Sequence, residues 1–509
     1  MTKLVPARWL APAAILIVAA LLTLPAALGP ARLNDSFWID WVWLDQFARE
    51  LGEGTLYPRW LPMSHDGLGS PVFYFYPPVA FYLASAFVFL GLNTYLALVA
   101  TFFAAFLLSG ATMFAWLKGQ VRDPLFGSLV FMIAPYHVFN FYQRGAIAEF
   151  LASALLPLVM LGIRRVVMNE RSGIWITALA YGALIATHLP LALLASLFLF
   201  LPYGLVSCRA STPLLLRLAL PFVIGAGLAA IYLVPALALE QFRDSAKLWA
   251  FSYLQPASWT VWDLQSWSDK NFRAVLLMFA TITIPILALV FRRRSGWAIW
   301  ALVCGLLAVG ILPFLWDLPG LRSVQFPFRL LPVAEFAFAT AIAFAPRSIT
   351  FSPVLWLPLI AMAGFVIIAK PAEVSVTLAE LQSLHPDVPE NLPPGHRPYS
   401  WPSSWALHIA GQHRSAQFDG HVTVEPSFYF PSWRVRCGGR LVSTYAAPET
   451  QLLAHEGANC SRSLRWTVPE RIGAALSAAA LLLLLLIAAV PRLRADRIRR
   501  NGSRPEVHP

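Results

Sequence analysis

The chain has 509 residues, of which 58% are hydrophobic and 13% charged, with a mean hydropathy of +0.63 and a formal net charge of +12. A soluble domain carries roughly 25% charged residues, so this composition excludes a soluble protein and predicts one that crosses a membrane many times. Lys and Arg gather in the cytoplasmic loops of membrane proteins, which explains the positive charge, and no nucleic-acid partner is expected.

Long apolar runs recur along the chain, and each can cross about 30 Å of hydrocarbon as a helix. We expect twelve transmembrane helices, within a range of eleven to thirteen, at 9–29, 96–117, 124–139, 148–165, 173–188, 190–207, 218–238, 274–291, 297–314, 330–345, 353–369 and 472–490. The first run could instead be a cleaved signal peptide, because Lys3 and Arg8 precede it. The expected fold class is an all-α polytopic membrane protein with a small extracytoplasmic β-domain near the C-terminus.

The first extracytoplasmic loop, residues 30–95, is long, acidic and aromatic. Apolar side chains recur with helical spacing from 37 to 51, which predicts a helix lying flat on the membrane surface. Asp35, Asp40 and Asp45 are spaced five residues apart at the beginning of this helix and along it. They could all be solvated acids, or one could be a general base whose pKa is raised by partial burial.

The rest of this loop carries one notable cation and one ambiguous apolar segment. Arg59 stands between aromatic residues in YPRW, where its guanidinium could bind a phosphate or anchor the loop. The segment 72–92 could be a further span, but counting it would place Arg164, Arg165 and 292–294 outside. We therefore expect a juxtamembrane or re-entrant helix there, opening with the aromatic sequence SPVFYFYPP.

The next extracytoplasmic loop, APYHVFNFYQRGAIAEF, brings His137, Arg144 and Glu149 to the mouth of two helices. Glu149 opens an apolar helix, where a carboxylate interacts favourably with the helix dipole, and Arg144 could merely neutralise it. Ionisable groups at membrane depth are candidates for function, so we predict a functional role for this group.

Two further signals lie on the same face of the membrane. His188 stands in the tight turn THLP between two spans, where a histidine can be simply interfacial. In SVQFPFRLLPVAEF, Arg329 begins a span and Glu335 follows six residues later. Glu335 could be a satisfied intramembrane acid, paired with Arg329 or a backbone amide, or a functional group.

Residues 370–471 differ in composition from the rest of the chain. The Pro-rich stretch NLPPGHRPYSWPSS precedes alternating runs such as HVTVEPSFYF and SWRVRCGGRLVSTY, and this period-two alternation predicts a small β-sandwich. Cys437 and Cys460 are candidates for a disulfide, which would fit an oxidising periplasm. Cys208 and Cys304 lie in or beside apolar runs and are expected to be inert.

Charge counting sets the orientation. With the N-terminus inside, the pieces assigned to the cytoplasm hold 19 of the 38 basic residues and four of the 26 acids, so their net charge is +15 and the remainder sums to −3. The positive-inside rule therefore predicts a multi-pass protein of a bacterial inner membrane with both termini cytoplasmic. The chain divides into a transmembrane domain (1–369), a periplasmic β-rich domain (370–471), and a final helix with a basic tail (472–509).

Motifs of soluble enzymes are absent, including a Gly-rich phosphate loop, CxxC or HExxH metal spacing and a GxSxG elbow. With no nucleotide motif, the energy for chemistry must arrive in the substrate. A sugar on a lipid phosphate supplies this energy, reaches the site through the membrane, and needs only a base and cations.

Several motifs together resemble a known family. They are GTLYPRW (54–60), GLGSPVFYFYPP (67–78), APYHVFNFYQRGAIAE (134–149), THLP (187–190), GLAAIYLVPAL (227–237), QFPFR (325–329) and FYFPSWRVRCGGR (428–440). They look like the membrane family described as 6-pyruvoyl-tetrahydropterin-synthase-related, a label that implies no pterin chemistry. That family in turn resembles GT-C glycosyltransferases, polytopic enzymes that use polyprenyl-phosphate sugars, and the resemblance covers nearly the whole chain.

This resemblance implies transfer of a sugar from a polyprenyl-phosphate donor to an extracytoplasmic glycan, lipid or protein acceptor. In GT-C enzymes an Asp of the first loop deprotonates the acceptor, and Asp40 matches that role best by its distance from Gly54, with Asp35 and Asp45 as substitutes. Glu149 matches a second acid that orients the acceptor or a divalent cation, Mg²⁺ or Mn²⁺.

The remaining roles follow from the same resemblance. The lipid phosphate would be held by cations and imidazoles of the loops, namely Arg59, His137, Arg144, His188 and Arg329. The chain lacks the paired Asp that better-understood members carry in the second loop, so the use of a metal is left open.

Two other classes of function stay open. A transporter or flippase for lipid-linked glycans would need paired inverted halves with broken helices near the midplane, and no internal symmetry is evident in the sequence. A non-catalytic assembly factor for envelope glycans would use the β-domain to bind a partner.

Overall fold

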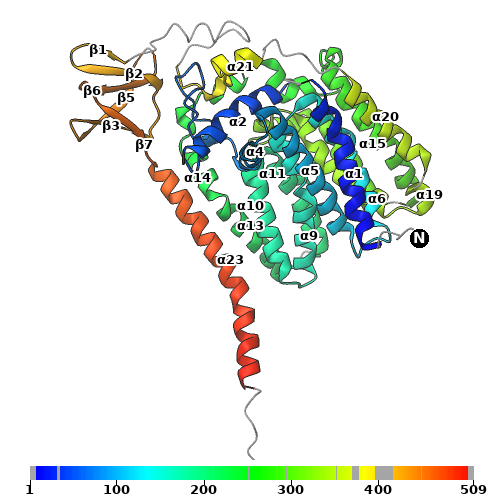
Figure 1. Ribbon diagram of the computed structural model, residues 1–509. Helices are drawn as coiled ribbons and strands as arrows, with labels where there is room; N and C mark the ends of the chain where they lie inside the picture. The colour runs from blue at the N-terminus through cyan, green and yellow to red at the C-terminus, as the bar shows by residue number, and fades with distance from the viewer. Residues whose placement is uncertain are drawn as a thin grey trace, which may run out of the picture.

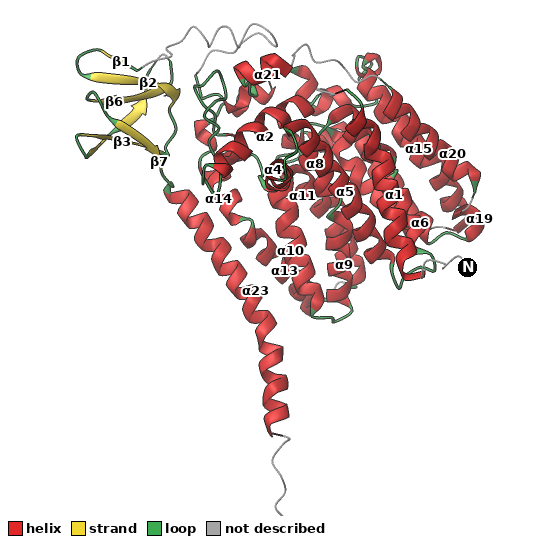
Figure 2. Cartoon of the chain, viewed as in Figure 1, coloured by secondary structure: helices red, strands yellow, loops and turns green. Residues whose placement is uncertain are grey.

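The computed structural model describes residues 7–30, 35–209, 211–249, 251–293, 295–350, 352–369, 378–395, 416–448 and 450–501. A helical bundle makes up most of the molecule, and a long final helix, α23 (Val468–Asn501), begins beside α14 and α13 and then extends beyond the bundle (Figure 1). Figure 2 shows that the strands are segregated from the bundle and lie at the start of α23.

Most helices of the bundle follow one another with short connections, and longer ones run over 53–71 and 239–269. In chain order they are α1 (Ala7–Leu28), α2 (Phe37–Gly52), α3 (Val72–Phe75), α4 (Val79–Phe89), α5 (Thr94–Leu117), α6 (Pro124–Met132), α7 (Pro135–Phe139), α8 (Ile147–Ser153), α9 (Leu156–Val167), α10 (Ser172–Thr187), α11 (Leu189–Ala195), α12 (Leu201–Ser207), α13 (Thr212–Leu228), α14 (Ala230–Ala238), α15 (Lys270–Arg293), α16 (Gly296–Ala308), α17 (Pro313–Trp316), α18 (Leu331–Ala343), α19 (Arg347–Thr350), α20 (Pro353–Ile368) and α21 (Leu378–Leu384). The π-helical turns η1 (Asn140–Arg144) and η2 (Ser196–Phe200) and the 3₁₀ turns η9 (Pro327–Leu330) and η10 (Pro389–Asn391) lie between them.

Seven helical stretches of the described chain are long and apolar enough to cross a membrane. They are Trp9–Leu28, Thr94–Leu117, Pro124–Arg144, Ile147–Val167, Leu189–Ser207, Lys270–Leu287 and Val468–Ala489. The pair α13 and α14, bent by 68° at its break, would be an eighth. The chain is therefore a mostly helical protein with the composition and helix lengths of a membrane protein.

The expected count of twelve spans is not confirmed. Four apolar helices are shorter, namely Val79–Phe89, Ser172–Thr187, Gly296–Ala308 and Pro353–Ile368, and α18 has only 13 residues. The span expected at 297–314 ends early because Gly310 adopts a left-handed conformation with φ +70°, which stops α16.

The ambiguous segment 72–92 folds as two short helices, α3 and α4, separated by Tyr76 and two prolines. Proline cannot continue a helix from the preceding turn without losing a hydrogen bond. The 11 residues of α4 reach only about 16 Å, which is half the hydrocarbon thickness. The segment is therefore not one continuous helix of spanning length, and its juxtamembrane or re-entrant placement stays a prediction.

The C-terminal region forms two small antiparallel sheets with the orders β1-β2-β6-β5 and β4-β3-β7. The strands are β1 (Gln417–Phe418), β2 (Val422–Phe428), β3 (Trp433–Cys437), β4 (Arg440–Val442), β5 (Thr444–Ala446), β6 (Leu452–Glu456) and β7 (Ser461–Leu464). A disulfide joins Cys437 to Cys460, and Cys208 and Cys304 are free and buried. The sheets occupy the region in which the alternating sequence predicted them.

The sheets share an apolar core with the first extracytoplasmic loop. The rings of Trp60 and Trp433 lie 5.6 Å apart, and those of Tyr74 and Phe430 lie 4.4 Å apart. The first loop and the sheets are thus one packed unit on one face of the bundle.

Parts of the expected domains lie outside the described residues. These are 1–6 and 502–509 at the termini, 31–34 in the first loop, and 370–377 and 396–415 around the Pro-rich stretch. In Figure 1 the beginning of α1 and the end of α23 both lie on the side of the molecule opposite to α2 and the sheets. The cytoplasmic placement of the termini remains a prediction.

Candidate active site

A polar cavity of about 170 Å³ lies where α2, the start of α8 and the segment 388–391 meet. Its walls come from stretches that are far apart in the chain. They are Ser36, Ile39, Asp40, Trp43, Phe75, Tyr76, Arg144, Ala146, Glu149, His188, Arg243, Gln325, Arg329, Val388, Glu390 and Asn391. The cavity therefore gathers five of the residues that the sequence predicted to form a site, namely Asp40, Arg144, Glu149, His188 and Arg329. Asp35 lies beside Arg144 but does not line this cavity.

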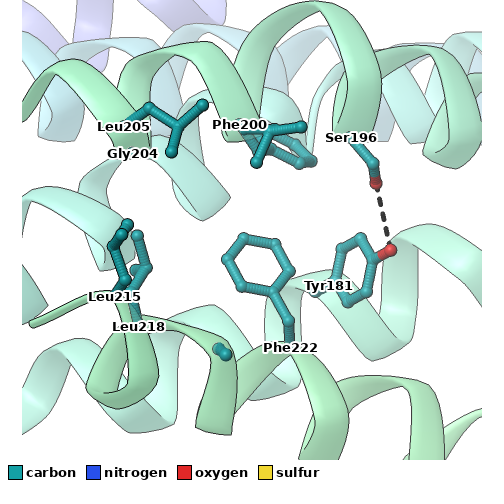
Figure 3. A pocket seen from close by; sticks show the side chains of 10 residues that line it. Tyr181, Ser196, Phe200, Gly204, Leu205, Leu215, Leu218 and Phe222 are labelled. Atoms are coloured by element: carbon teal, nitrogen blue, oxygen red, sulfur yellow. Dashed lines mark hydrogen bonds between the residues drawn. The ribbon is translucent and has the colours of Figure 1, made fainter. Parts of the chain in front are cut away.

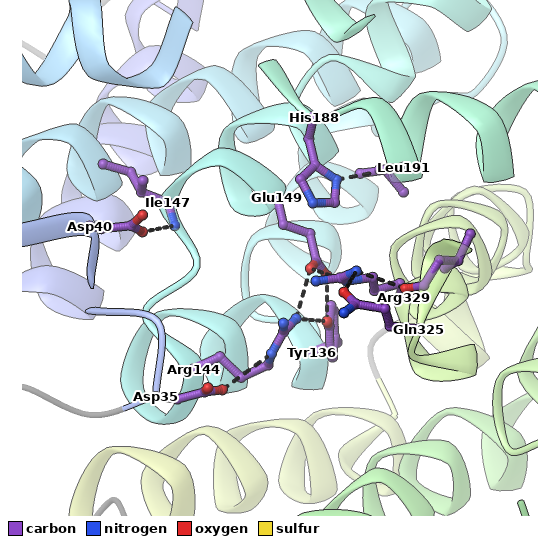
Figure 4. Close-up of polar contacts among 11 residues, drawn as sticks. Asp35, Asp40, Tyr136, Arg144, Ile147, Glu149, His188, Leu191, Gln325 and Arg329 are labelled. Atoms are coloured by element: carbon purple, nitrogen blue, oxygen red, sulfur yellow. Dashed lines mark hydrogen bonds and ion pairs between the residues drawn. The ribbon is translucent and has the colours of Figure 1, made fainter. Parts of the chain in front are cut away.

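An ionic cluster centred on Glu149 forms one wall of this cavity (Figure 4). Arg144 Nη1 donates to Glu149 Oε2 at 2.7 Å, and Arg329 Nε donates to the same oxygen at 3.3 Å. The Tyr136 hydroxyl donates to Glu149 Oε1 and accepts a hydrogen bond from Arg144 Nη1 at 2.6 Å. Two guanidinium groups face one buried carboxylate, so the cluster of these three charges is net positive.

The local sequence explains how Arg144 and Glu149 meet. Arg144 ends the π-helical turn η1, and Glu149 lies in the first turn of α8. Between them Gly145 has φ +68°, and a Cβ atom there would lie 2.5 Å from Phe37 Cβ. Only glycine fits this left-handed, closely packed position, so the chain can reverse and bring the two charged side chains together.

Arg329 is held from a different element. Its Nη1 donates to the Val324 carbonyl oxygen at 2.7 Å and to Gln325 Oε1 at 3.2 Å, and its guanidinium lies 4.8 Å from the Phe326 ring centroid. Gln325 itself has φ +68°, a strained conformation for a residue with a Cβ atom. Such strain is concentrated at functional sites.

Asp40 approaches the cavity from α2. Its Oδ2 accepts a hydrogen bond of 3.2 Å from the backbone N–H of Ile147, the first residue of α8, so it caps that helix from another segment. Only 2% of the residue is exposed. Burial raises the pKa of the Asp40 carboxyl well above its ordinary value, which favours the protonated form.

Asp35 and His188 lie at the margins of the ionic cluster. Asp35 Oδ2 is 3.6 Å from Arg144 Nε and is more than half exposed. His188 lines the cavity, and its Nδ1 accepts a hydrogen bond from the Leu191 N–H at 3.2 Å, which caps α11. Because Nδ1 accepts, the proton of a neutral His188 lies on Nε2.

Arg59 does not reach the cavity. Its Nε lies 3.1 Å from Glu470 Oε1, its Nη2 donates to the Ile231 carbonyl oxygen at 2.8 Å, and its guanidinium lies 3.8 Å from the Tyr57 ring centroid. Arg59 therefore connects the first loop to the beginning of α23. Of the two alternatives for this residue, its contacts fit the anchoring of the loop and not the binding of a phosphate.

His137 is also turned away from the cavity, toward Glu335. His137 Nδ1 lies 2.7 Å from Glu335 Oε2, and the Tyr136 backbone N–H donates to Glu335 Oε1 at 2.5 Å. Of the two partners expected for Glu335, a backbone amide or Arg329, the structure shows the backbone amide. Arg329 pairs with Glu149 instead. The buried His137–Glu335 pair joins α7 to α18.

Asp45 lies on another face of α2. Its Oδ2 is 3.4 Å from Arg49 Nη2 and 3.6 Å from His385 Nε2. Five residues of helix turn the side chain by about 140° relative to Asp40, so the two carboxyls cannot share the cavity.

Several residues of the cavity lining and of the ionic cluster were not singled out from the sequence. Tyr136 and Gln325 fall inside the motifs compared above, so their positions were marked but their roles were not. Arg243 stands in a stretch without a local signal, Glu390 and Asn391 stand at the beginning of the Pro-rich stretch, and only the tertiary structure brings them to the cavity.

The binding of a divalent cation, Mg²⁺ or Mn²⁺, stays a prediction, and the described residues offer no group of side chains that suits such an ion. Among the described residues, the group of three potential ligand side chains that lie close enough to share an ion is Cys437, His455 and Cys460. Two of these are joined in the disulfide, so they do not offer thiolates. No step is therefore assigned to a metal.

Two apolar cavities adjoin the helices. One of about 200 Å³ shares Arg144 and Asp35 with the ionic cluster and is otherwise lined mainly by aromatic and apolar side chains, including Phe139, Trp259, Phe326 and Phe328. The other, of about 300 Å³, lies between α10, α12 and α13, and its lining carries one hydrogen bond, between Tyr181 and Ser196 (Figure 3). Only the first of these cavities adjoins charged groups.

Comparisons with known proteins give little beyond this geometry. No family model matches the chain, and no curated protein matches it. A cryo-EM structure of the arabinofuranosyltransferase AftD from mycobacteria matches with 17% identity and a TM-score of 0.44, over 71% of this chain and 28% of that chain. The chain thus spans less than a third of that protein's length, and the resemblance to the 6-pyruvoyl-tetrahydropterin-synthase-related family finds no support in these comparisons.

Proposed function

We propose that the chain is an integral membrane glycosyltransferase that moves a sugar from a polyprenyl-phosphate donor to an extracytoplasmic glycan, lipid or protein. The observation that carries this proposal is a pair of guanidinium groups, the buried Arg144 and the partly buried Arg329, on the wall of a cavity that also contains the Asp40 carboxyl. Cations and an acid are the groups that such a reaction needs.

The two arginines suit a phosphate. Guanidinium groups bind phosphate oxygens through charge-assisted, often bidentate hydrogen bonds, each contributing about 1.5–3 kcal/mol. Negative charge grows on the lipid phosphate as its bond to the sugar breaks, and fixed cations in a buried site stabilise that charge. Glu149, held by three donors, would position both arginines and not contact the acceptor.

Asp40 suits the role of general base. As the acceptor hydroxyl oxygen attacks the anomeric carbon, its proton passes to the Asp40 carboxylate, and the electrons of the breaking C–O bond leave with the lipid phosphate. Burial raises the pKa of Asp40, which makes its carboxylate a stronger base than that of an exposed aspartate.

The aromatic cavity beside Arg144 suits the lipid. It shares Arg144 with the polar cavity, so a molecule with its phosphate at Arg144 could place its sugar in one cavity and its first isoprene units in the other. Phe326 and Phe328 stand next to this guanidinium, with ring centroids 5.8 Å and 5.2 Å from it.

The distribution of charge supports an extracytoplasmic site in a bacterial inner membrane. The basic loops predicted to be cytoplasmic include those that follow α5, α9 and α18, with Lys118, Arg171 and Arg347. The polar cavity is built instead from α2 and from the connections at the other ends of these helices.

The lipid carriers of a deletion strain test the proposal. Loss of the gene should lead to accumulation of one polyprenyl-phosphate sugar, which the wild-type gene and an Arg347→Gln control should reverse but Asp40→Asn should not. Restoration by Asp40→Asn would instead favour an assembly factor. Accumulation of a larger lipid-linked glycan in the inner leaflet would favour a flippase.

A further inference from the structure

The wall of the cavity opposite the membrane helices is a short segment that links the transmembrane helices to the sheets. We propose that this segment, residues 385–392, is the acceptor-binding wall, and that Glu390 and Asn391 bind the hydroxyls of a neutral acceptor sugar. The inference rests on the proposed function and names the substrate class on its acceptor side. We call this segment the strap.

The strap has a fixed position because both of its ends are fastened. Near its beginning the Trp43 indole N–H donates to Asp387 Oδ1 at 2.9 Å, and His385 Nε2 lies 3.6 Å from Asp45 Oδ2. At its other end the Leu392 carbonyl oxygen accepts a hydrogen bond from the Asp244 N–H at 2.9 Å. The strap is therefore held against α2 on one side and against the chain after α14 on the other.

The hydrogen bonds inside the strap determine which groups are available to a ligand. The Asp387 carboxylate accepts from the Val388 N–H at 2.7 Å and from the Asn391 side-chain nitrogen at 3.3 Å, and it is completely buried. Asp387 is thus a positioning residue, while Glu390 and the Asn391 amide oxygen remain as polar groups of the cavity wall.

The chemistry of Glu390 suits a sugar hydroxyl. Glu390 is partly buried, and burial raises the pKa of its carboxyl to about 7. The positive charge of Arg243 lowers this pKa and so opposes the effect of burial. Near neutral pH this carboxyl exists in both forms, so it can donate or accept a hydrogen bond, as a hydroxyl group also does.

The remaining lining suits a sugar ring. Trp43, Phe75 and Tyr76 offer flat apolar surfaces beside the polar strap, and sites of this kind combine aromatic walls with a few placed polar groups. The volume of about 170 Å³ is below the roughly 300–1,000 Å³ of sites for drug-sized ligands, so the cavity fits a small group such as a sugar ring.

The charged groups of the cavity differ between the side proposed for the donor phosphate and the side proposed for the acceptor sugar. Arg144 and Arg329 lie on the wall formed by the membrane helices, whereas Asp40 and Glu390 come from α2 and the strap. The third arginine of the lining, Arg243, lies after α14 and is paired with Glu240 at 2.9 Å. Carboxylates repel phosphate, so the anionic donor should be directed to the arginines and an uncharged sugar to the strap.

The test uses the full-length protein in nanodiscs and two probes. The first is a panel of methyl glycosides of neutral hexoses and pentoses, with binding measured by saturation-transfer NMR; the second is undecaprenyl phosphate. Glu390→Ala and Asn391→Ala should each weaken sugar binding about tenfold or more, the loss of about 1.4 kcal/mol, and leave lipid-phosphate binding unchanged. Arg329→Gln should do the reverse, and Glu53→Ala, an exposed acid at the end of α2, should change neither.

A pH series separates a binding role from a structural one. Sugar binding to the wild type should change between pH 6 and 8, and in Glu390→Gln it should be independent of pH over that range. Sugar binding that is unaffected by both Ala substitutions, or a wild type that binds no sugar of the panel, overturns the inference. Failure of the wild type to bind undecaprenyl phosphate instead overturns the proposed function, whatever the sugars do.

Discussion

The guanidinium of Arg144 and the carboxylate of Glu149 lie 2.7 Å apart inside the protein. In the chain, the turn at Gly145 and the beginning of α8 separate the two residues. Both side chains are less than 8% exposed, so each charge depends on the other for compensation. The same turn presents the Ile147 N–H to Asp40. One backbone reversal therefore positions both the cationic wall and the acid of the proposed site.

Removal of one member of this pair should be costly. Arg144→Gln leaves Glu149 with Arg329 and Tyr136 but without its shortest ion pair, and breaking a buried pair typically costs about 3–5 kcal/mol of unfolding free energy. We expect a large fall in the melting temperature of the detergent-solubilised protein and loss of transfer.

The matched control is Arg347→Gln, which breaks the exposed Arg347–Asp123 pair of 3.2 Å at the other end of the bundle. Exposed pairs contribute about 0–1 kcal/mol, so its melting temperature should stay close to that of the wild type. Equal shifts for the two variants would refute the role given to the buried pair.

Asp40→Asn should abolish transfer without unfolding the protein, because an amide oxygen can still accept the Ile147 N–H. In the wild type the rate should rise with pH, and the rise should lie above the ordinary pKa of an aspartate, since the base must lose its proton and burial has raised its pKa. A pH–rate profile checks this. Asp45→Asn, on another face of α2, should keep both the activity and the profile, and an active Asp40→Asn enzyme would remove Asp40 from the proposed role.

Glu390 should make stability depend on pH. Its pKa in the folded protein, about 7, lies above the ordinary value of 4.5, so the folded state binds more protons than the unfolded state between these values. Stability should therefore fall as the pH rises from about 4.5 to 7, by at most about 3 kcal/mol. Melting temperatures across this range should show a weaker decline in Glu390→Gln, and identical slopes would contradict the burial of this carboxyl.

Accessibility to a membrane-impermeant maleimide tests the orientation. Leu56 and Met168 are exposed, at 85% and 55%, in the first loop and after α9. In intact spheroplasts Leu56→Cys should be labelled and Met168→Cys should be labelled only after lysis. The native cysteines are buried or in a disulfide, so they should add little background. Labelling in the opposite pattern would put the cavity in the cytoplasm.

Much of the site could be predicted because its signals are local. Arg144 and Glu149 lie close together in one motif, and Arg329 begins a helix, so charges on apolar segments identified them. The helices were equally visible in hydropathy, although α3 with α4 and α13 with α14 show that proline and tight turns break apolar segments into shorter pieces.

The roles of other residues depend on partners that no local pattern reveals. Arg59 pairs with Glu470, and Trp43 binds Asp387, over separations of more than 300 residues in each case. From sequence, Arg59 looks like a ligand for phosphate and Glu390 looks like an acid in a Pro-rich linker. Only the packing of the first loop against the sheets and the strap decides which of the two faces the cavity.

The most direct test of the central claim is photo-crosslinking with a polyprenyl phosphate that carries a diazirine near its phosphate, followed by mass spectrometry of the labelled peptides. We expect labelling of the peptides around Arg144 and Arg329, and less labelling in Arg329→Gln. Labelling confined to the apolar cavity between α10 and α13, or unchanged in that variant, would contradict this claim.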